Sequence, residues 1–155
     1  MAGLALAAVI WLDIPVDPMI DVGTPSGRPA LYSGFAGDEG GPDRTFAWVD
    51  GTQAEVLVAR RSRRDADLVI VCQPNLASTV SQEMSVVLNS VLLGSTRLRE
   101  GWQTVTLPAP GRVWQIGLNE LTLSFSNAIS PRDEGASDDP RRLSVAFDRL
   151  SVRTR

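Results

Sequence analysis

The stretch AEVLVA at residues 54–59 shows most clearly the pattern that recurs along the chain. Val56 and Val58 alternate with Glu55 and Leu57, which places the two pairs on opposite faces of an extended chain. A period of two residues with β-branched side chains is typical of a half-buried β-strand. Similar runs recur along the chain, and we expect strands at residues 45–49, 54–59, 67–72, 84–89, 91–95, 102–107, 120–126 and 143–153.

Turn residues separate these runs. Asp50-Gly51 predicts a hairpin between two of them, because glycine accepts the positive φ of primed turns, and Asn89-Ser90 is a weaker version of the same signal. About eight to ten short strands without helical crossovers predict an all-β fold, a two-sheet antiparallel β-sandwich. We place this domain at residues 19–155, after an apolar N-terminal segment and linker at residues 1–18.

Two longer segments, residues 24–44 and 130–140, are rich in glycine, proline and acidic residues. We expect both to be irregular and to lie at the ends or across one face of the sandwich. Binding residues are often found in such loops.

The charged residues exclude several chemistries. All 15 basic residues are arginine, and the chain has no histidine. Without histidine there is no catalytic triad, and without lysine there is no Schiff base. We therefore expect no enzyme and no cofactor. The net charge of −3 argues against nucleic acid as a partner.

A basic cluster comprises Arg60, Arg61, Arg63 and Arg64. Aspartates follow it, which favours a solvated turn between strands. Contact with phosphate or anionic lipid is the alternative.

Cys72 is the single cysteine and ends an apolar run at residues 68–71. One thiol builds neither an intrachain disulfide nor a cysteine zinc site. We expect Cys72 to be a small core residue.

Residues 3–12 (GLALAAVIWL) form a continuous apolar stretch that is too short to span a bilayer. No basic residue precedes Arg28, which argues against a standard signal peptide. Three interpretations stay open: a helix buried against a partner, an interfacial anchor, or the tail of a membrane segment. The residues expected to make membrane or partner contact are Leu4, Leu6, Ile10 and Trp11.

Short motifs in the second half of the chain follow one another as VLNSVLLG at 87–94, GWQTV at 101–105 and GLNELTL at 117–123, and the chain closes with VAFDRLSV at 145–152. Together they resemble carbohydrate-binding-module-like jelly rolls of the galactose-binding type. Asn89-Ser90 stands where that family has Asn-Gly. The resemblance covers roughly residues 21–153 and implies a jelly-roll sandwich with a glycan as a partner.

A narrower resemblance rests on Ser130-Pro131-Arg132 and on residues 138–148. These are similar to the soluble β-sandwich that follows the membrane helices of some bacterial membrane glycosyltransferases and related envelope proteins. No glycosyltransferase helices are present in this sequence.

The binding candidates are aromatic and charged residues. Trp48, Trp102 and Trp114 are expected to fill the core, with a sugar-stacking platform at Trp48 and Trp102 as the alternative. Arg132 and Arg142 could clasp an anion in a bidentate way. The alternative, which we favour, is that the charged residues of this loop pair internally and pin it against the sheet; they are Arg132, Asp133, Glu134, Asp138, Asp139, Arg141 and Arg142.

The jelly-roll resemblance also raises the question of a structural calcium ion. Asp21 and Asp148 would meet if the first and last strands pair. A calcium site takes six or more oxygens, and two aspartates do not supply them, so we predict no metal.

These observations predict a non-catalytic interaction module. Our first hypothesis is an accessory subunit of a bacterial membrane-associated complex, held to protein partners and peripherally to the membrane, with the periplasmic side favoured. The alternative is a glycan-binding domain. The apolar segment at residues 3–12 ranks the first ahead of the second.

Overall fold

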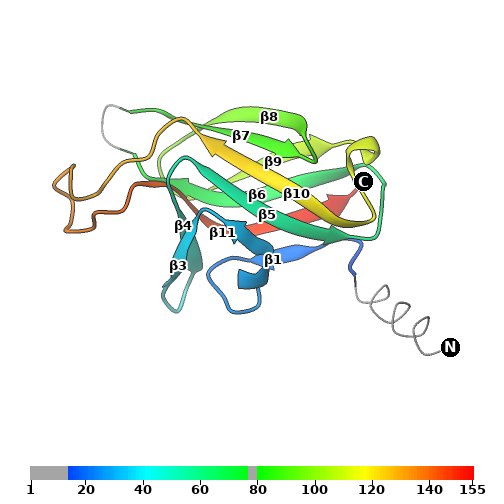
Figure 1. The fold of residues 1–155 in the computed structure, drawn as a ribbon, viewed down its shortest axis with the longest axis horizontal. Coiled ribbons are helices and arrows are strands. Elements are labelled where there is room, and N and C mark those ends of the chain that lie inside the picture. The colour runs from blue at the N-terminus through cyan, green and yellow to red at the C-terminus, as the bar shows by residue number, and fades with distance from the viewer. Residues whose placement is uncertain (1–13, 77–79) are drawn as a thin grey trace.

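The computed structural model describes residues 14–76 and 80–155 and shows two antiparallel sheets packed face to face (Figure 1). The first sheet contains β1 (Met19–Asp21), β3 (Phe35–Gly40), β4 (Thr45–Asp50), β6 (Ala66–Pro74), β9 (Gln103–Ala109) and β11 (Leu143–Thr154). The second contains β2 (Leu31–Ser33), β5 (Gln53–Arg60), β7 (Gln82–Leu88), β8 (Val91–Leu98) and β10 (Gly117–Phe125). Two short 3-10 helices are η1 (Arg28–Ala30) and η2 (Gly111–Val113).

The predicted two-sheet antiparallel sandwich is confirmed, and a strand is found at each of the expected runs. The strand order is β3-β4-β11-β6-β9 in the first sheet, with β1 paired to β11, and β2-β5-β10-β7-β8 in the second. No helix in the described part of the chain is long and apolar enough to cross a membrane.

The prediction that residues 24–44 are irregular is wrong, because η1, β2 and β3 lie within this segment. β3 has the sequence FAGDEG and pairs only with β4, so it is an edge strand without an alternating apolar face. Arg28 holds it by pairing with Asp38 at 2.7 Å and by donating to the Ala36 carbonyl at 2.7 Å. Long-range contacts of this kind leave no periodic signal in the sequence.

The prediction of a hairpin at Asp50-Gly51 is also wrong, since β4 and β5 belong to different sheets. Gly51 does adopt a positive φ of 106°. A sharp turn serves a crossing between sheets as well as a hairpin, so the turn residues did not reveal which strands pair. The Asn89-Ser90 turn is confirmed: both residues have positive φ, and Leu88 pairs with Val91 across it.

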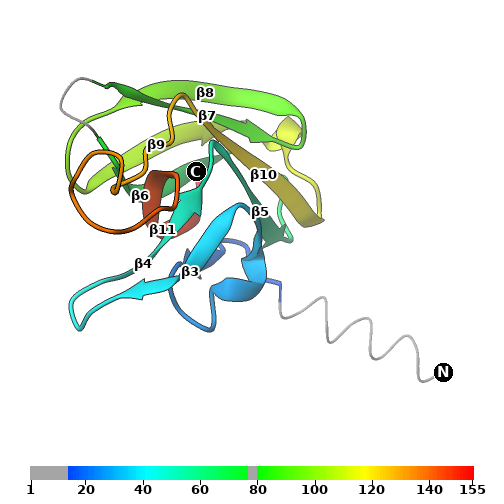
Figure 2. The same ribbon diagram turned by 60° about the vertical axis from the view of Figure 1, so that its left-hand side comes forward.

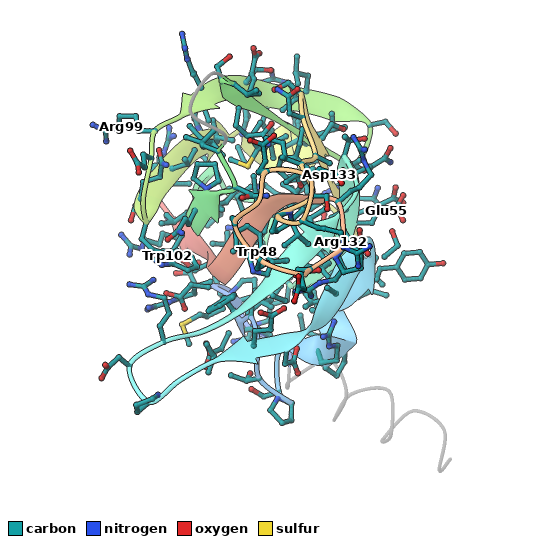
Figure 3. All side chains as sticks on the ribbon, turned by 90° about the vertical axis from the view of Figure 1, so that its left-hand side faces the viewer. Trp48, Glu55, Arg99, Trp102, Arg132 and Asp133 are labelled. Atoms are coloured by element: carbon teal, nitrogen blue, oxygen red, sulfur yellow. The ribbon has the colours of Figure 1, made fainter. Side chains whose placement is uncertain are left out.

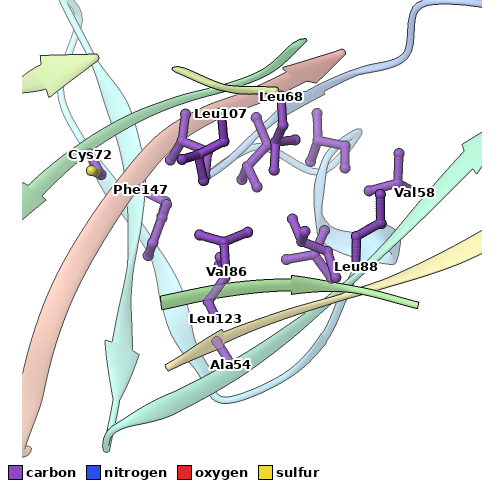
Figure 4. Packing of buried hydrophobic residues seen from close by; sticks show 14 of the residues in the cluster. Ala54, Val58, Leu68, Cys72, Val86, Leu88, Leu107, Leu123 and Phe147 are labelled. Atoms are coloured by element: carbon purple, nitrogen blue, oxygen red, sulfur yellow. The ribbon is translucent and has the colours of Figure 1, made fainter. Parts of the chain in front are cut away.

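The core lies between the sheets and is built from the inward side of each alternating strand (Figure 4). In β5 every second side chain from Ala54 to Arg60 is buried. Phe147 of β11 is fully buried in this core, and its ring contacts those of Phe35 and Phe125 at centroid distances of 5.9 and 6.0 Å. The sandwich is therefore closed by large side chains contributed by both sheets.

Cys72 is fully buried in this core, as expected. Burial raises the pKa of its thiol to about 12, because the thiolate is poorly solvated there. We therefore predict that Ellman's reagent at pH 8 labels Cys72 only after unfolding in guanidinium chloride. Since the thiolate is the reactive species, a native thiol of raised pKa stays inert. Rapid labelling of the native protein would contradict this placement.

The expectation of a solvated turn at the basic cluster is wrong for Arg60, which ends β5 and is fully buried. Its guanidinium lies 4.5 Å from the centroid of the Trp114 ring. It also donates to the Val16 carbonyl at 3.1 Å, the Arg64 carbonyl at 3.0 Å and the Thr154 hydroxyl at 2.9 Å. This side chain joins β5, β11 and the chain that enters the domain.

Candidate binding groove

One end of the sandwich gathers the β4–β5, β6–β7, β8–β9 and β10–β11 connections. Figure 2 turns this end toward the viewer, with the β10–β11 loop curling in front of it. Two contacts draw the connections together: the Asn75 amide donates to the Ser144 carbonyl at 2.8 Å, and Gly51 donates to the Arg142 carbonyl at 2.6 Å. The end is therefore built from segments far apart in the sequence.

A groove of about 700 Å³ opens at this end. Its lining residues are Trp48, Gln73, Pro74, Asn75, Leu76, Val80, Glu100 and Gly101. They combine an aromatic ring, apolar side chains, two carboxamides and one carboxylate. Small-molecule sites typically combine an apolar wall with a few placed polar groups in this way.

The alternation of β4 places Trp48 at the groove. Ala47 and Val49 are fully buried in the core, so Phe46 and Trp48 point to the outer face of the first sheet. Trp48 pairs across to Ala146 of β11, a small residue that leaves room for the indole ring. The ring is half-buried and lines the groove.

Trp102 belongs to an aromatic row that also contains Phe46 and Trp48. Figure 3 labels the two tryptophans. The Trp102 ring lies 5.7 Å from that of Phe46, which is 6.3 Å from that of Trp48. The guanidinium of Arg44 lies over the Trp102 ring at 4.4 Å. Trp102 therefore supports the row, whereas Trp48 lines the groove.

The expectation that all three tryptophans fill the core holds for Trp114 alone, which is fully buried with its indole N–H donating to the Ala109 carbonyl at 3.2 Å. Trp48 and Trp102 lie on the outer face of the first sheet and are only half-buried. The outer face has room for them because its central strand presents Ala146 there.

Three polar groups of the groove were missed from the sequence: Gln73, Asn75 and Glu100. The Asn75 side chain is anchored, because its amide nitrogen donates to the carbonyls of Ile129 at 3.0 Å and Leu143 at 3.2 Å. Gln73 is the second-last residue of β6, and Glu100 lies in the β8–β9 turn. These three residues come together only because the loops pack against one another, and no local sequence motif predicts that packing.

The structure places Arg132, Asp139 and Arg142 in the β10–β11 loop, apart from the groove lining. Arg132 donates to the Asp138 carbonyl at 3.2 Å and Arg142 to the Ala128 carbonyl at 2.9 Å. Asp139 instead pairs with Arg141 at 2.6 Å, and this arginine lowers the pKa of the Asp139 carboxyl by hydrogen bonding. Arg132 and Asp139 also meet through the backbone, because the Arg132 amide donates to the Asp139 carbonyl at 2.9 Å. The internal pairing predicted for this loop is therefore present.

Arg141 fastens this loop to the first sheet. Its guanidinium also pairs with Glu39 of β3 at 2.7 Å. Hydrogen bonds to both carboxylates raise the pKa of Arg141 above its usual value. The predicted pinning of the loop is therefore present. Arg141 supplies the ion pair to the first sheet, and the Arg142 amide donates to the Asp50 carboxylate at 3.2 Å.

The residues near Asp21 and Asp148 do not fit a calcium ion. The first and last strands do pair, with Asp21 opposite Arg149, and both aspartates line one hollow of about 340 Å³. However, Arg44 pairs with the Asp148 carboxylate at 2.5 Å, so a guanidinium already neutralises it. Within residues 14–76 and 80–155, no group of three or more acidic or cysteine side chains is arranged to hold a metal.

The N-terminal candidates Leu4, Leu6, Ile10 and Trp11 lie outside the described residues, which begin at Ile14.

No sequence family matches this chain, and neither does any curated protein sequence. Solved structures do resemble it. The CBM36-1 domain of a multidomain xylanase from the hindgut metagenome of Trinervitermes trinervoides is 8% identical with a TM-score of 0.52, over 88% of this chain and 95% of that one.

The C-terminal CBM6 of the laminarinase LamC from Zobellia galactanivorans gives 10% identity and a TM-score of 0.52, over 89% and 99% of the two chains. The GH26-CBM35 β-(1,4)-mannanase of Podospora anserina gives 11% and 0.54, over 90% of this chain but 28% of the enzyme. These TM-scores establish a shared fold, and at identities this low the similarity shows the fold alone. The chain has the jelly-roll β-sandwich fold of carbohydrate-binding modules.

Proposed function

We propose that this domain binds a glycan in the groove lined by Trp48. The groove itself carries the proposal, because it sets an indole ring beside the polar side chains of Gln73, Asn75 and Glu100. An aromatic ring can stack on the apolar face of a pyranose, while amides and a carboxylate can exchange hydrogen bonds with its hydroxyls. The jelly-roll fold shared with carbohydrate-binding modules supports this function.

The anchoring of the groove supports binding without a large rearrangement. Asn75 is held by two backbone carbonyls, and Trp48 is packed against Phe46. Pre-organised groups lose less conformational entropy when a ligand binds. The walls are therefore ready for a ligand in the free protein.

The hypothesis of an accessory subunit in a membrane-associated complex stays a prediction, and no structural neighbour supports it. The same holds for protein partners. The absence of catalysis remains an expectation that follows from the lack of histidine and lysine.

Replacing Trp48 tests the proposal. We expect Trp48→Ala to weaken glycan binding by roughly thirtyfold, because a tryptophan at the centre of a contact typically contributes about 2 kcal/mol. A glycan array first identifies a ligand for the unaltered chain, and isothermal titration calorimetry then compares the variants with it.

Tyr32→Ala is the matched control. Tyr32 is 68% exposed on β2 and does not line the groove, so its removal should leave the affinity unchanged. A glycan that binds both variants equally would place the site elsewhere. No binding to any glycan on the array would refute the proposed function.

A further inference from the structure

The end of the sandwich opposite the groove gathers arginines from three separate segments. Arg61, Arg63 and Arg64 lie in the β5–β6 loop, Arg112 in η2, and Arg153 and Arg155 at the end of β11. We call these six residues the arginine end. In Figure 1 it lies on the side of the C-terminus.

Direct contacts hold the three segments together. Arg64 donates to the Arg155 carbonyl at 3.3 Å, and the Arg155 amide donates to the Asp65 carbonyl at 3.0 Å. The Gly111 amide donates to the Asp65 carboxylate at 2.6 Å. The arginines therefore form one surface.

This surface is positive although the protein is negative. The acidic residues of the same segments and of the entering chain are Asp17, Asp65 and Asp67. Six arginines against three aspartates leave a local charge of +3, whereas the whole chain carries −3. The remaining surface is correspondingly acidic, so the molecule is electrically polarised along its length.

Exposed apolar side chains also lie in segments at this end. The most exposed large hydrophobic residues of the described chain are Val16, Met19, Tyr32, Val91, Leu92, Ile116 and Leu118. All except Tyr32 belong to segments at this end: the entering chain with β1, the start of β8, and the start of β10 with the residue before it. The exposed fractions of Leu92 and Leu118 reach 61% and 64%. Clustered exposed apolar groups mark an interaction surface.

The described chain also enters the domain at this end. It begins at Ile14, and the Pro15 carbonyl accepts a hydrogen bond from the Arg61 amide at 3.3 Å. The entering chain therefore borders the arginine end.

We propose that the arginine end and the exposed apolar side chains at the same end dock on an anionic lipid membrane. Membrane-surface binding combines buried apolar groups with basic side chains near anionic headgroups, and this end supplies both. A phosphate backbone offers no apolar surface on which exposed leucine and isoleucine side chains could be buried. The observations therefore favour a membrane over nucleic acid. The groove at the opposite end then faces away from the bilayer. This inference is independent of the proposed glycan binding.

The test is co-sedimentation of the full chain with vesicles of phosphatidylcholine, alone or mixed with phosphatidylserine. We expect binding that requires phosphatidylserine and weakens as salt is added. The double variant Arg112→Gln, Arg153→Gln should bind the vesicles roughly thirtyfold more weakly. Each arginine lost near an anionic surface reduces the affinity by roughly fivefold. Both residues are exposed, so the fold should persist.

The matched control is Arg97→Gln, Arg99→Gln, which removes the same charge from exposed arginines near the groove end. It should bind like the unaltered chain. Ile116→Ser with Leu118→Thr should weaken binding while leaving the charge intact. Equal losses in the two arginine variants, or no dependence on phosphatidylserine, would overturn the proposal. Tighter binding to a DNA duplex than to the anionic vesicles at equal salt would also overturn it.

Discussion

Phe147→Ala should destabilise the domain by about 3–5 kcal/mol, a large part of the roughly 5–15 kcal/mol available to a domain. The side chain is fully buried, and β11 carries it between β4 and β6. Its ring bridges Phe35 of the first sheet and Phe125 of the second. Truncation leaves a cavity where the two sheets meet, and a close-packed interior fills such a cavity poorly.

Guanidinium unfolding followed by tryptophan fluorescence measures this loss. Phe46→Ala is the control, because it makes the same chemical change on the half-buried outer face. The midpoint should fall much further for Phe147→Ala than for Phe46→Ala, with the denaturant slope unchanged. Equal shifts would show that Phe147 is not central to the packing between the sheets.

Arg60→Ala should cost about 3 kcal/mol or more. The substitution uncovers the Trp114 ring and removes the donor from three acceptors, among them the carbonyls of Val16 and Arg64. A buried acceptor left unpaired costs about 1–3 kcal/mol, and these acceptors are partly buried, so water reduces the sum. Burial lowers the pKa of Arg60 from its usual value, opposed by the charge of Asp17. The guanidinium nevertheless stays charged, as arginine does in proteins.

Thermal and guanidinium unfolding of Arg60→Ala, Arg60→Lys and Arg112→Ala measure how much stability comes from the charge at position 60 and how much from the hydrogen bonds of its guanidinium. Lysine keeps the charge but lacks the planar fork that reaches several acceptors at once, so Arg60→Lys should recover only part of the stability. Arg112 is exposed, and Arg112→Ala should change the stability by less than about 0.5 kcal/mol. A loss at Arg60 no larger than that at Arg112 would contradict its structural role.

Only part of the candidate site could be predicted from local sequence. Trp48 was named from the sequence because an aromatic residue in a small β-domain suggests either a core or a platform. Gln73, Asn75 and Glu100 carry no motif, and they meet Trp48 only because strand ends from β4, β6 and β8 converge. The arginine cluster was visible as a run, yet its members separated: Arg60 turned inward, and its neighbours joined Arg112 and Arg155 at the surface.

The residue pattern by itself determined the strands, their antiparallel class and the lack of histidine and lysine chemistry, because alternation and composition are local properties of the chain. Tertiary structure decided which sheet each strand joins, as the crossing at Gly51 shows. It also placed Trp48 outside the core and Arg60 within it, and it recruited the glycine-rich segment 24–44 as an edge. Each of these outcomes depends on contacts between residues distant in sequence, such as Arg28 with Asp38 or Arg60 with Thr154. Those contacts form only when the two sheets close over a common core.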